Sequence, residues 1–182
     1  ASQLALTISN NRKKRVAVLE EKTIGLLHRV GMPNALLKVD IQQVPLYEGG
    51  TDKVMFLFDA NKSDRFEPLH KVASGGELSR LMLSIKSLVA SFVAMPTLIF
   101  DEIDTGISGK IAQKVGHALK SLASFHQIIS ITHLPQIAGL ADHHYSVEKK
   151  IVGERVISLV TKLNENSRIR EVAKLLSGEN VT

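Results

Sequence analysis

The sequence predicts an α/β domain with a parallel-sheet core, preceded by one long amphipathic helix. After residue 70 the apolar pattern alternates between helix and strand with short links, which favours parallel strands joined by right-handed crossovers. Before that point, apolar residues recur at helical spacing. With 182 residues, of which 44% are hydrophobic and 23% charged, the chain is long enough to bury a hydrophobic core.

The N-terminal segment is expected to be a helix that ends at Gly31 and Pro33. Its narrow apolar stripe is typical of one half of a two-helix coiled coil rather than of a core helix. The stripe consists of Leu4, Ile8, Val16, Leu19, Leu27 and Val30. Residues 1–33 are therefore expected to form the end of a coiled-coil arm.

Two strands are expected next, at 35–44 and 53–58, around a Gly49-Gly50 turn. Residues 59–68 are expected to form a polar loop. A helix then follows, stopped by Pro96. Its apolar face comprises Leu78, Leu81, Met82, Ile85, Leu88, Val89 and Phe92. The remaining expected elements are strands at 97–101, 127–132, about 143–148 and about 155–161, and helices at 111–122 and 167–176, the last capped by Gly178.

Composition narrows the classes of function. The absence of cysteine excludes disulfides, thiolate zinc sites and cysteine nucleophiles, and it suits a reducing compartment. No run of residues has the length and apolarity of a membrane helix, and the first residues lack the order of a signal peptide, so a cytoplasmic protein without membrane contact is expected. Aromatic residues make up only 4% of the chain, so stacking platforms for single-stranded nucleic acid are not expected.

The net charge of +5 is concentrated near the N-terminus. The first 35 residues hold six lysines and arginines against two glutamates. Four of these basic residues are consecutive: Arg12, Lys13, Lys14 and Arg15. Such a run attracts a polyanion such as DNA, although it is also typical of a solvated helix face.

Acidic residues follow the apolar strand at 97–101, in the segment TLIFDEIDTGISGK. Ligands of open α/β sheets bind at the carboxyl ends of strands, where Asp101 and Glu102 lie, and His133 follows the next strand. Asp101 suits a magnesium ion held through water, and Glu102 suits a base that deprotonates an attacking water. The alternative is a buried strand that ends in acids at a solvent edge.

The Gly109-Lys110 pair does not complete a phosphate-binding loop. That loop requires G-x-x-x-x-G-K-[ST], but Asp104 stands at its first glycine position and Ile111 at its hydroxyl position. No other window of the sequence fits the pattern. The pair is therefore interpreted as the start of a helix.

The segment SGGELSR, residues 74–80, has two interpretations. Ser74 and Glu77 fit a helix capping box, which needs no ligand. Alternatively, Gly75 and Gly76 expose backbone N–H groups to an anion at the helix N-terminus, with the Ser74 hydroxyl as a further donor. His133 is likewise either a structural histidine or a contact to a γ-phosphate. His143 and His144 are expected on opposite faces of a strand, as surface residues.

In this order, SGGELSR, LIFDE and ITH resemble the C-terminal half of an ABC-type ATPase head, as its signature motif, Walker B motif and switch histidine. The longer segments VASGGELSRLMLSIK, DEIDTGISGKIA, ITHLPQIAGLADHH and REVAKLLSG resemble the RecN family of bacterial DNA repair ATPases, relatives of the SMC proteins. The resemblance covers most of residues 70–178. GMPNALLKV is similar to the place where the coiled coil of that family returns to the head.

The resemblance implies a role for each matching residue. Ser74, Gly75, Gly76 and Glu77 would contact ATP held by the opposite protomer, Asp101 would hold Mg²⁺, Glu102 would be the general base, and His133 would sense the γ-phosphate. Asp104, Thr105, Gly106 and Ser108 would belong to the D-loop at the dimer seam. Ser108 departs from the broader SMC pattern, which ends this loop in an aspartate.

The resemblance also implies a division of the complete protein. Residues 34–182 would be the C-terminal half of the ATPase head, and an N-terminal half beyond a coiled coil would supply the Walker A motif. The complete protein would be an ATPase that homodimerises through ATP and acts on DNA in double-strand break repair and recombination, in the cytoplasm on the nucleoid. This chain alone would be inactive. The alternative function is a non-catalytic DNA-binding or scaffolding module.

Overall fold

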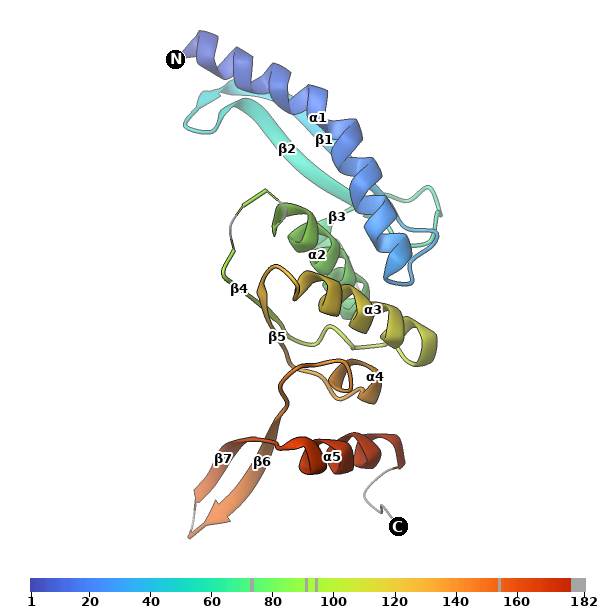
Figure 1. Cartoon of the computed structure of the whole chain (residues 1–182). Coiled ribbons are helices and arrows are strands. Elements are labelled where there is room, and N and C mark those ends of the chain that lie inside the picture. The colour runs from blue at the N-terminus through green and yellow to red at the C-terminus, as the bar shows by residue number, and fades with distance from the viewer. Residues whose placement is uncertain (73, 91, 94, 154, 178–182) are drawn as a thin grey trace.

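The molecule is elongated, with the N-terminal helix and a long hairpin at one end and a second hairpin with the last helix at the other (Figure 1). The computed structural model describes residues 1–72, 74–90, 92, 93, 95–153 and 155–177. Three sheets follow one another along the chain: an antiparallel sheet β1–β2–β3, a parallel pair β4–β5 and an antiparallel pair β6–β7. Within the described ranges, no helix is long and apolar enough to cross a membrane.

The N-terminal helix α1 (Ser2–Arg29) is confirmed, and it packs along the hairpin of β1 and β2. The predicted stripe is only partly right: Leu27 and Val30 are buried, but Leu4 is 66% exposed and Ile8 is 37% exposed. Near the N-terminus the helix instead buries Ala5 and Ser9, because its small residues face the hairpin. The assignment of residues 1–33 to a coiled-coil arm stays a prediction.

The hairpin strands β1 (Leu36–Tyr47) and β2 (Gly50–Asp59) are longer than predicted. Tyr47 pairs with Gly50, so the turn is formed by residues 48 and 49 and not by Gly49-Gly50. The predicted polar loop is also too long, since β3 (Glu67–Pro68) pairs with β2 and a short 3₁₀ helix (Leu69–Lys71) follows.

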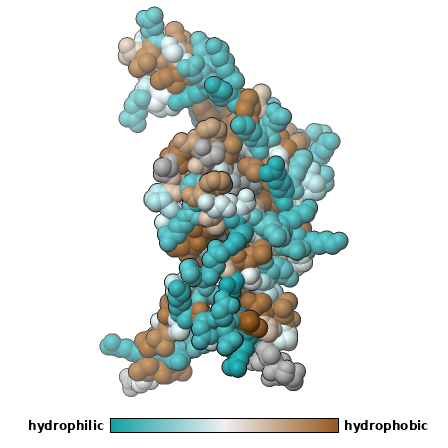
Figure 2. Space-filling model, viewed as in Figure 1, coloured by the Kyte–Doolittle hydropathy of each residue, from teal (hydrophilic) through white to brown (hydrophobic). Residues whose placement is uncertain are grey.

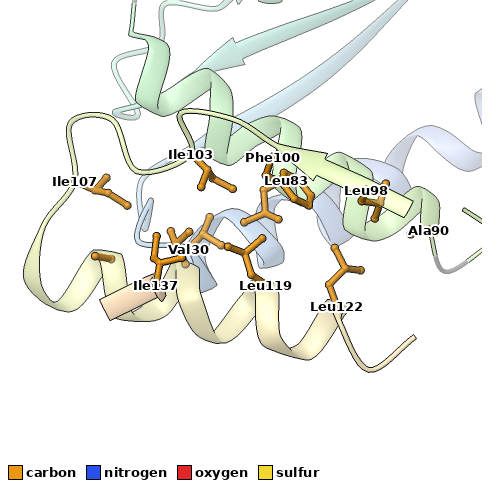
Figure 3. Packing of buried hydrophobic residues seen from close by; sticks show 12 residues of the cluster. Val30, Leu83, Ala90, Leu98, Phe100, Ile103, Ile107, Leu119, Leu122 and Ile137 are labelled. Atoms are coloured by element: carbon orange, nitrogen blue, oxygen red, sulfur yellow. The ribbon is translucent and has the colours of Figure 1, made fainter. Parts of the chain in front are cut away.

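The centre of the molecule holds α2 (Gly75–Ala90), β4 (Thr97–Phe100), α3 (Gly109–Leu122) and β5 (Gln127–Ser130). The strands are parallel, with Thr97 opposite Gln127, which confirms the predicted strand–helix–strand unit. Apolar residues of α2, β4 and α3 meet in the larger core cluster, together with Val30 and Ile137 (Figure 3).

Helix α2 lies between two apolar clusters, with Leu83 in the larger one and Leu81 in a second one formed with α1 and the hairpin. The prediction of a single apolar face on α2 is therefore incomplete, because the helix contributes residues to both clusters. Met82 and Val89 are each 37% exposed, and Phe92 lies beyond the helix and is 74% exposed.

The C-terminal part comprises α4 (Pro135–Ala138), β6 (Tyr145–Val152), β7 (Arg155–Lys162) and α5 (Glu165–Ser177). His143 and His144 precede β6, so their predicted place on a strand is wrong. The N-terminus of α5 is capped by Asn164, whose Oδ1 accepts the Ser167 N–H at 2.9 Å. The predicted cap at Gly178 lies outside the described residues.

Candidate functional site

The carboxyl ends of β4 and β5 bring several predicted site residues to one edge. Phe100 lies opposite Ser130 at the ends of the parallel strands, and the Ile131 N–H donates to the Phe100 carbonyl at 2.9 Å. Asp101 and Glu102 continue from β4 and are exposed, and His133 follows β5 with its side chain 70% exposed. Glu102 has a φ of +52°, which is uncommon for a residue with a side chain and typical of functional turns.

Asp104 lies behind this edge, where it is only 3% exposed. Its Oδ2 accepts the Thr132 hydroxyl and, at 2.8 Å, the His133 backbone N–H. The Nδ1 of the His133 ring lies 3.1 Å from the same oxygen. The Asp104 carboxylate thus points inward at the segment that contains His133, a contact that the sequence did not suggest for a residue of the predicted D-loop.

The N-terminus of α2 abuts the loop that contains Asp104. The Glu77 N–H donates to the Ser74 Oγ at 3.4 Å, a long contact of the capping type predicted for this pair. A Cβ atom on Gly76 would lie 2.0 Å from the carbonyl oxygen of Thr105, so only glycine fits there. Around Gly75 there is open space instead. The structure therefore joins the predicted signature motif to the predicted D-loop within one chain.

Arg80, in the second turn of α2, is a buried charged residue near the predicted signature motif that the sequence alone did not single out. It is 8% exposed, and its Nε and Nη1 atoms have no hydrogen-bond partner among the described residues. Burial lowers the pKa of its guanidinium from the usual value, and the charge of Glu77 opposes that shift. The Nη1 atom lies 3.5 Å from the position of a Cβ on Gly76, so this charge is close to the glycine pair. Burying a charged group with two nitrogen atoms left without partners in the described part of the chain is costly, and this cost distinguishes Arg80 from an ordinary polar residue of a helix.

The residues present fit a magnesium ion only in part. No group of three or more His, Asp or Glu side chains in the described ranges could hold a metal ion. Asp101 offers a single exposed carboxylate at a cavity of about 220 Å³ between α2 and β4. The cavity is lined by Leu78, Ser79, Met82, Lys86, Ile99, Phe100, Asp101 and Ile103. Mg²⁺ suits such a site because it keeps several waters and takes one or two carboxylates together with phosphate oxygens.

The four consecutive basic residues of α1, Arg12 to Arg15, differ in their contacts. The Arg12 guanidinium pairs with Asp52 at 3.2 Å and donates to the Gly49 carbonyl, which ties α1 to the β1–β2 turn. Ser9 also donates to Asp52, at 2.7 Å. The Ser9 hydrogen bond and then Arg12 lower the pKa of Asp52, against the opposing effect of burial. Lys13, Lys14 and Arg15 are exposed.

The arrangement of elements is shared with solved heads of SMC proteins. An Smc head domain with a coiled coil and joint from Pyrococcus yayanosii has a TM-score of 0.68 at 17% identity, over 91% of this chain and 30% of that chain. A second solved structure, described in terms of ATP-driven dimerization and DNA-stimulated activation of SMC ATPases, has a TM-score of 0.60 at 16% identity. The match covers 94% of this chain and 99% of that chain. The fold is that of the C-terminal lobe of an SMC-type ATPase head.

Comparison of sequences is more specific, although no model of a protein family matches the chain. The chain is 34% identical to DNA repair protein RecN of Halalkalibacterium halodurans over 180 residues and 40% identical to that of Rickettsia conorii over 177 residues, each covering 96% of this chain. The RecN of Haemophilus influenzae is 38% identical over 186 residues. The chain belongs to the RecN family. It spans about a third of these relatives, 32% or 33% of their length.

Proposed function

We propose that this chain supplies the C-terminal half of a composite ATP site in an SMC-like ATPase that acts in DNA repair. The observation that carries the proposal is the meeting of three predicted motifs. Asp101, Glu102 and His133 lie at one edge of β4–β5, and Gly76 of α2 closely approaches the Thr105 carbonyl in the loop that follows Glu102. Family membership supports the same function, because the matched relatives are DNA repair proteins.

Each residue at this edge has a distinct role in the proposal. Asp101 would hold Mg²⁺, which when bound would neutralise charge on the phosphates. Glu102, exposed next to it, would accept the proton of the attacking water. His133 would contact the γ-phosphate through the ring atom that does not face Asp104. Ser74, Gly75 and Gly76, with Glu77 as part of the cap, would bind the phosphate of ATP held by a second protomer.

The parallel sheet has an open apolar face. On this face Ile99 is 57% exposed, Ile129 is 45% exposed and Ile131 is 58% exposed. Parallel sheets are normally covered on both faces, and two strands alone are marginally stable. We propose that the N-terminal half of the same head covers these isoleucines and brings the phosphate-binding loop that the sequence lacks.

Dimerisation and DNA binding complete the proposal. One matched SMC structure is described in terms of ATP-driven dimerization and DNA-stimulated activation. By analogy, two copies of the complete protein would close around two ATP molecules, each signature motif facing the ATP of the other copy. The exposed Lys13, Lys14 and Arg15 would contact the DNA backbone, whereas Arg12 has a structural role.

The deciding experiment mixes this chain with the N-terminal half of the same protein and measures ATP turnover. We expect turnover from the mixture and none from the chain alone, because the glycine loop and lysine that position the phosphates are missing from its sequence. A lysine substitution in the phosphate loop of the added half should remove the activity again. Turnover by the chain alone that is lost on Glu102→Gln would contradict the half-site proposal. A mixture that binds DNA without hydrolysing ATP would favour the non-catalytic module.

A further inference from the structure

We propose that Asp104 is a positioning residue for His133, holding the proton of the imidazole on Nδ1 so that Nε2 faces the reacting phosphate. This inference rests on the proposed function and deepens it. The sequence resemblance places Asp104 in the D-loop at the dimer seam. In the structure its carboxylate turns into its own chain, where it accepts the backbone N–H of His133 and lies close to the ring of the same residue.

The contacts of Asp104 place one of its carboxylate oxygens next to the His133 ring. One carboxylate oxygen accepts the His133 backbone N–H at 2.8 Å and lies 3.1 Å from Nδ1 of the same residue. An ionised carboxylate can only accept hydrogen bonds, so this close approach is favourable when Nδ1 carries the proton. Nε2 is then an acceptor in the neutral ring and a donor in the charged ring. The His133 side chain is 70% exposed, so Nε2 is free to meet a ligand at the strand edge.

The surroundings of Asp104 fix the carboxylate itself. The neighbouring Ile103 and Ile107 are 1% and 8% exposed and belong to the larger core cluster. Asp104 is therefore anchored on both sides by the packed core, and burying its charge requires strong donors. The Thr132 hydroxyl is one of them, and it also accepts the Leu134 N–H at 3.1 Å, which orders the turn after β5.

If Asp104 had only a structural role, it would not need its contact to the His133 ring. The Thr132 hydroxyl and the His133 backbone N–H already partner the buried oxygen. The additional contact to Nδ1 does not bury the ring. Its physical effect is to select one tautomer and one orientation of an exposed imidazole, as a carboxylate does for a histidine in other sites where the second ring nitrogen is the functional one.

The kinetic test uses the complete protein and compares wild type, Asp104→Asn, His133→Ala and the double variant. Asparagine keeps the size of the side chain, but it is neutral and can donate to the ring as well as accept. We expect Asp104→Asn to lower kcat about 10- to 100-fold, the range seen when a carboxylate that orients a metal-binding histidine is removed, with a smaller change in KM for ATP. In the His133→Ala background the same substitution should add nothing. Asp142→Asn changes an exposed aspartate paired with Lys120 and is the matched control, expected to turn over like wild type.

A spectroscopic test reads the ring directly in the wild-type protein, so it does not depend on the folding of a variant. Nitrogen-15 NMR of histidine-labelled protein distinguishes Nδ1–H from Nε2–H, and loss of a signal in His133→Ala assigns it. We expect Nδ1–H for His133, and a shift toward Nε2–H, the tautomer that free imidazole side chains prefer, in Asp104→Asn. An Nε2–H ring in the wild type would overturn the proposal. So would a kinetic effect of Asp104→Asn that persists at full size without His133.

The two tests separate this inference from the function on which it rests. If His133→Ala turns over like wild type while the wild-type ring carries its proton on Nδ1, the positioning contact is real and the histidine has no part in hydrolysis. If His133→Ala is slow and Asp104→Asn is not, the proposed function stands and the positioning role of Asp104 is wrong.

Discussion

The carbonyl oxygen of Thr105 lies 2.0 Å from the position that a Cβ atom would take on Gly76. Two segments almost 30 residues apart in the sequence thus touch through backbone alone. The second glycine of SGGELSR is required by this contact, whereas open space surrounds the first glycine. The two glycines of the motif therefore have different physical roles, and substitution can separate them.

Gly76→Ala should destabilise the complete protein by about 1–3 kcal/mol, because the methyl group cannot fit without moving the Thr105 backbone. Gly75→Ala is the matched control. It meets nothing within 4 Å and should be neutral or stabilise by up to about 1 kcal/mol. The free energies of unfolding of both variants are measured in urea. Equal values would mean that the close contact between Gly76 and Thr105 does not exist.

Glu102→Gln should preserve ATP binding and lower hydrolysis about 10²- to 10⁴-fold, because an amide can orient water but cannot accept its proton. The measurement is single-turnover hydrolysis by the complete protein, with nucleotide affinity measured separately. Glu48→Gln, at the exposed turn of the first hairpin, controls for the change of charge. Hydrolysis by Glu102→Gln at the rate of this control would remove Glu102 from the role of base.

Ser74→Arg should prevent ATP-dependent dimerisation while leaving ATP binding to each head intact. The exposed Ser74 lies at the start of α2, and a long cation there would occupy the space proposed for the phosphate of the opposite protomer. Analytical ultracentrifugation with and without ATP reads the outcome. Ser124→Arg, at an exposed position after α3, should dimerise normally. Normal dimerisation of both variants would mean that the signature motif does not face a partner.

Neutralising Lys13, Lys14 and Arg15 together should weaken DNA binding and flatten its dependence on salt. Each lost phosphate contact lowers the slope of log affinity against log salt by about 0.9 for duplex DNA. Arg12→Ala should act differently, lowering stability through the loss of its pairing with Asp52. An unchanged slope for the triple variant would leave these residues as a solvated helix face.

Asp52 should make the stability of the protein depend on pH at the acidic end. Its pKa is lowered in the folded state, chiefly by the Ser9 hydrogen bond and then by Arg12. The carboxylate therefore contributes stability above the unfolded pKa of about 3.9, and this contribution is lost as the pH falls toward the lower folded value. The difference in unfolding free energy between wild type and Asp52→Asn should be largest near neutral pH and shrink below about pH 4. A constant difference between pH 7 and 3 would contradict this assignment.

Helices and strands could be predicted from the sequence where a local pattern of apolar residues and turn residues determines the structure. The spacing of Val115, Leu119 and Leu122 gives α3, and the strands on either side of it are apolar runs bounded by turn residues. The burial of α1 could not be predicted in the same way, because the hairpin decides which side faces inward: Ser9 is buried by its hydrogen bond to Asp52, and Leu4 is not buried.

The residues of the candidate site could be found by motif, but their contacts could not. The partners Asp104 and His133 are 29 residues apart, and only the parallel register of β4 and β5 brings them together. Arg80 reads in the sequence as an ordinary polar position on a helix. Its burial is a property of the tertiary structure, in which α2 lies between two apolar clusters.

The hairpin of β6 and β7 has consequences for handling the protein. Apolar residues cover its surface at the lower end of the molecule (Figure 2), and Val147, Ile151 and Val160 are each at least 65% exposed. Every residue described in β7 is exposed. A two-stranded ribbon of this composition has two open edges, which are templates for the addition of further strands from other molecules. We expect the isolated chain to self-associate as its concentration rises and to bind hydrophobic dyes, and we expect co-expression with the N-terminal half to suppress both.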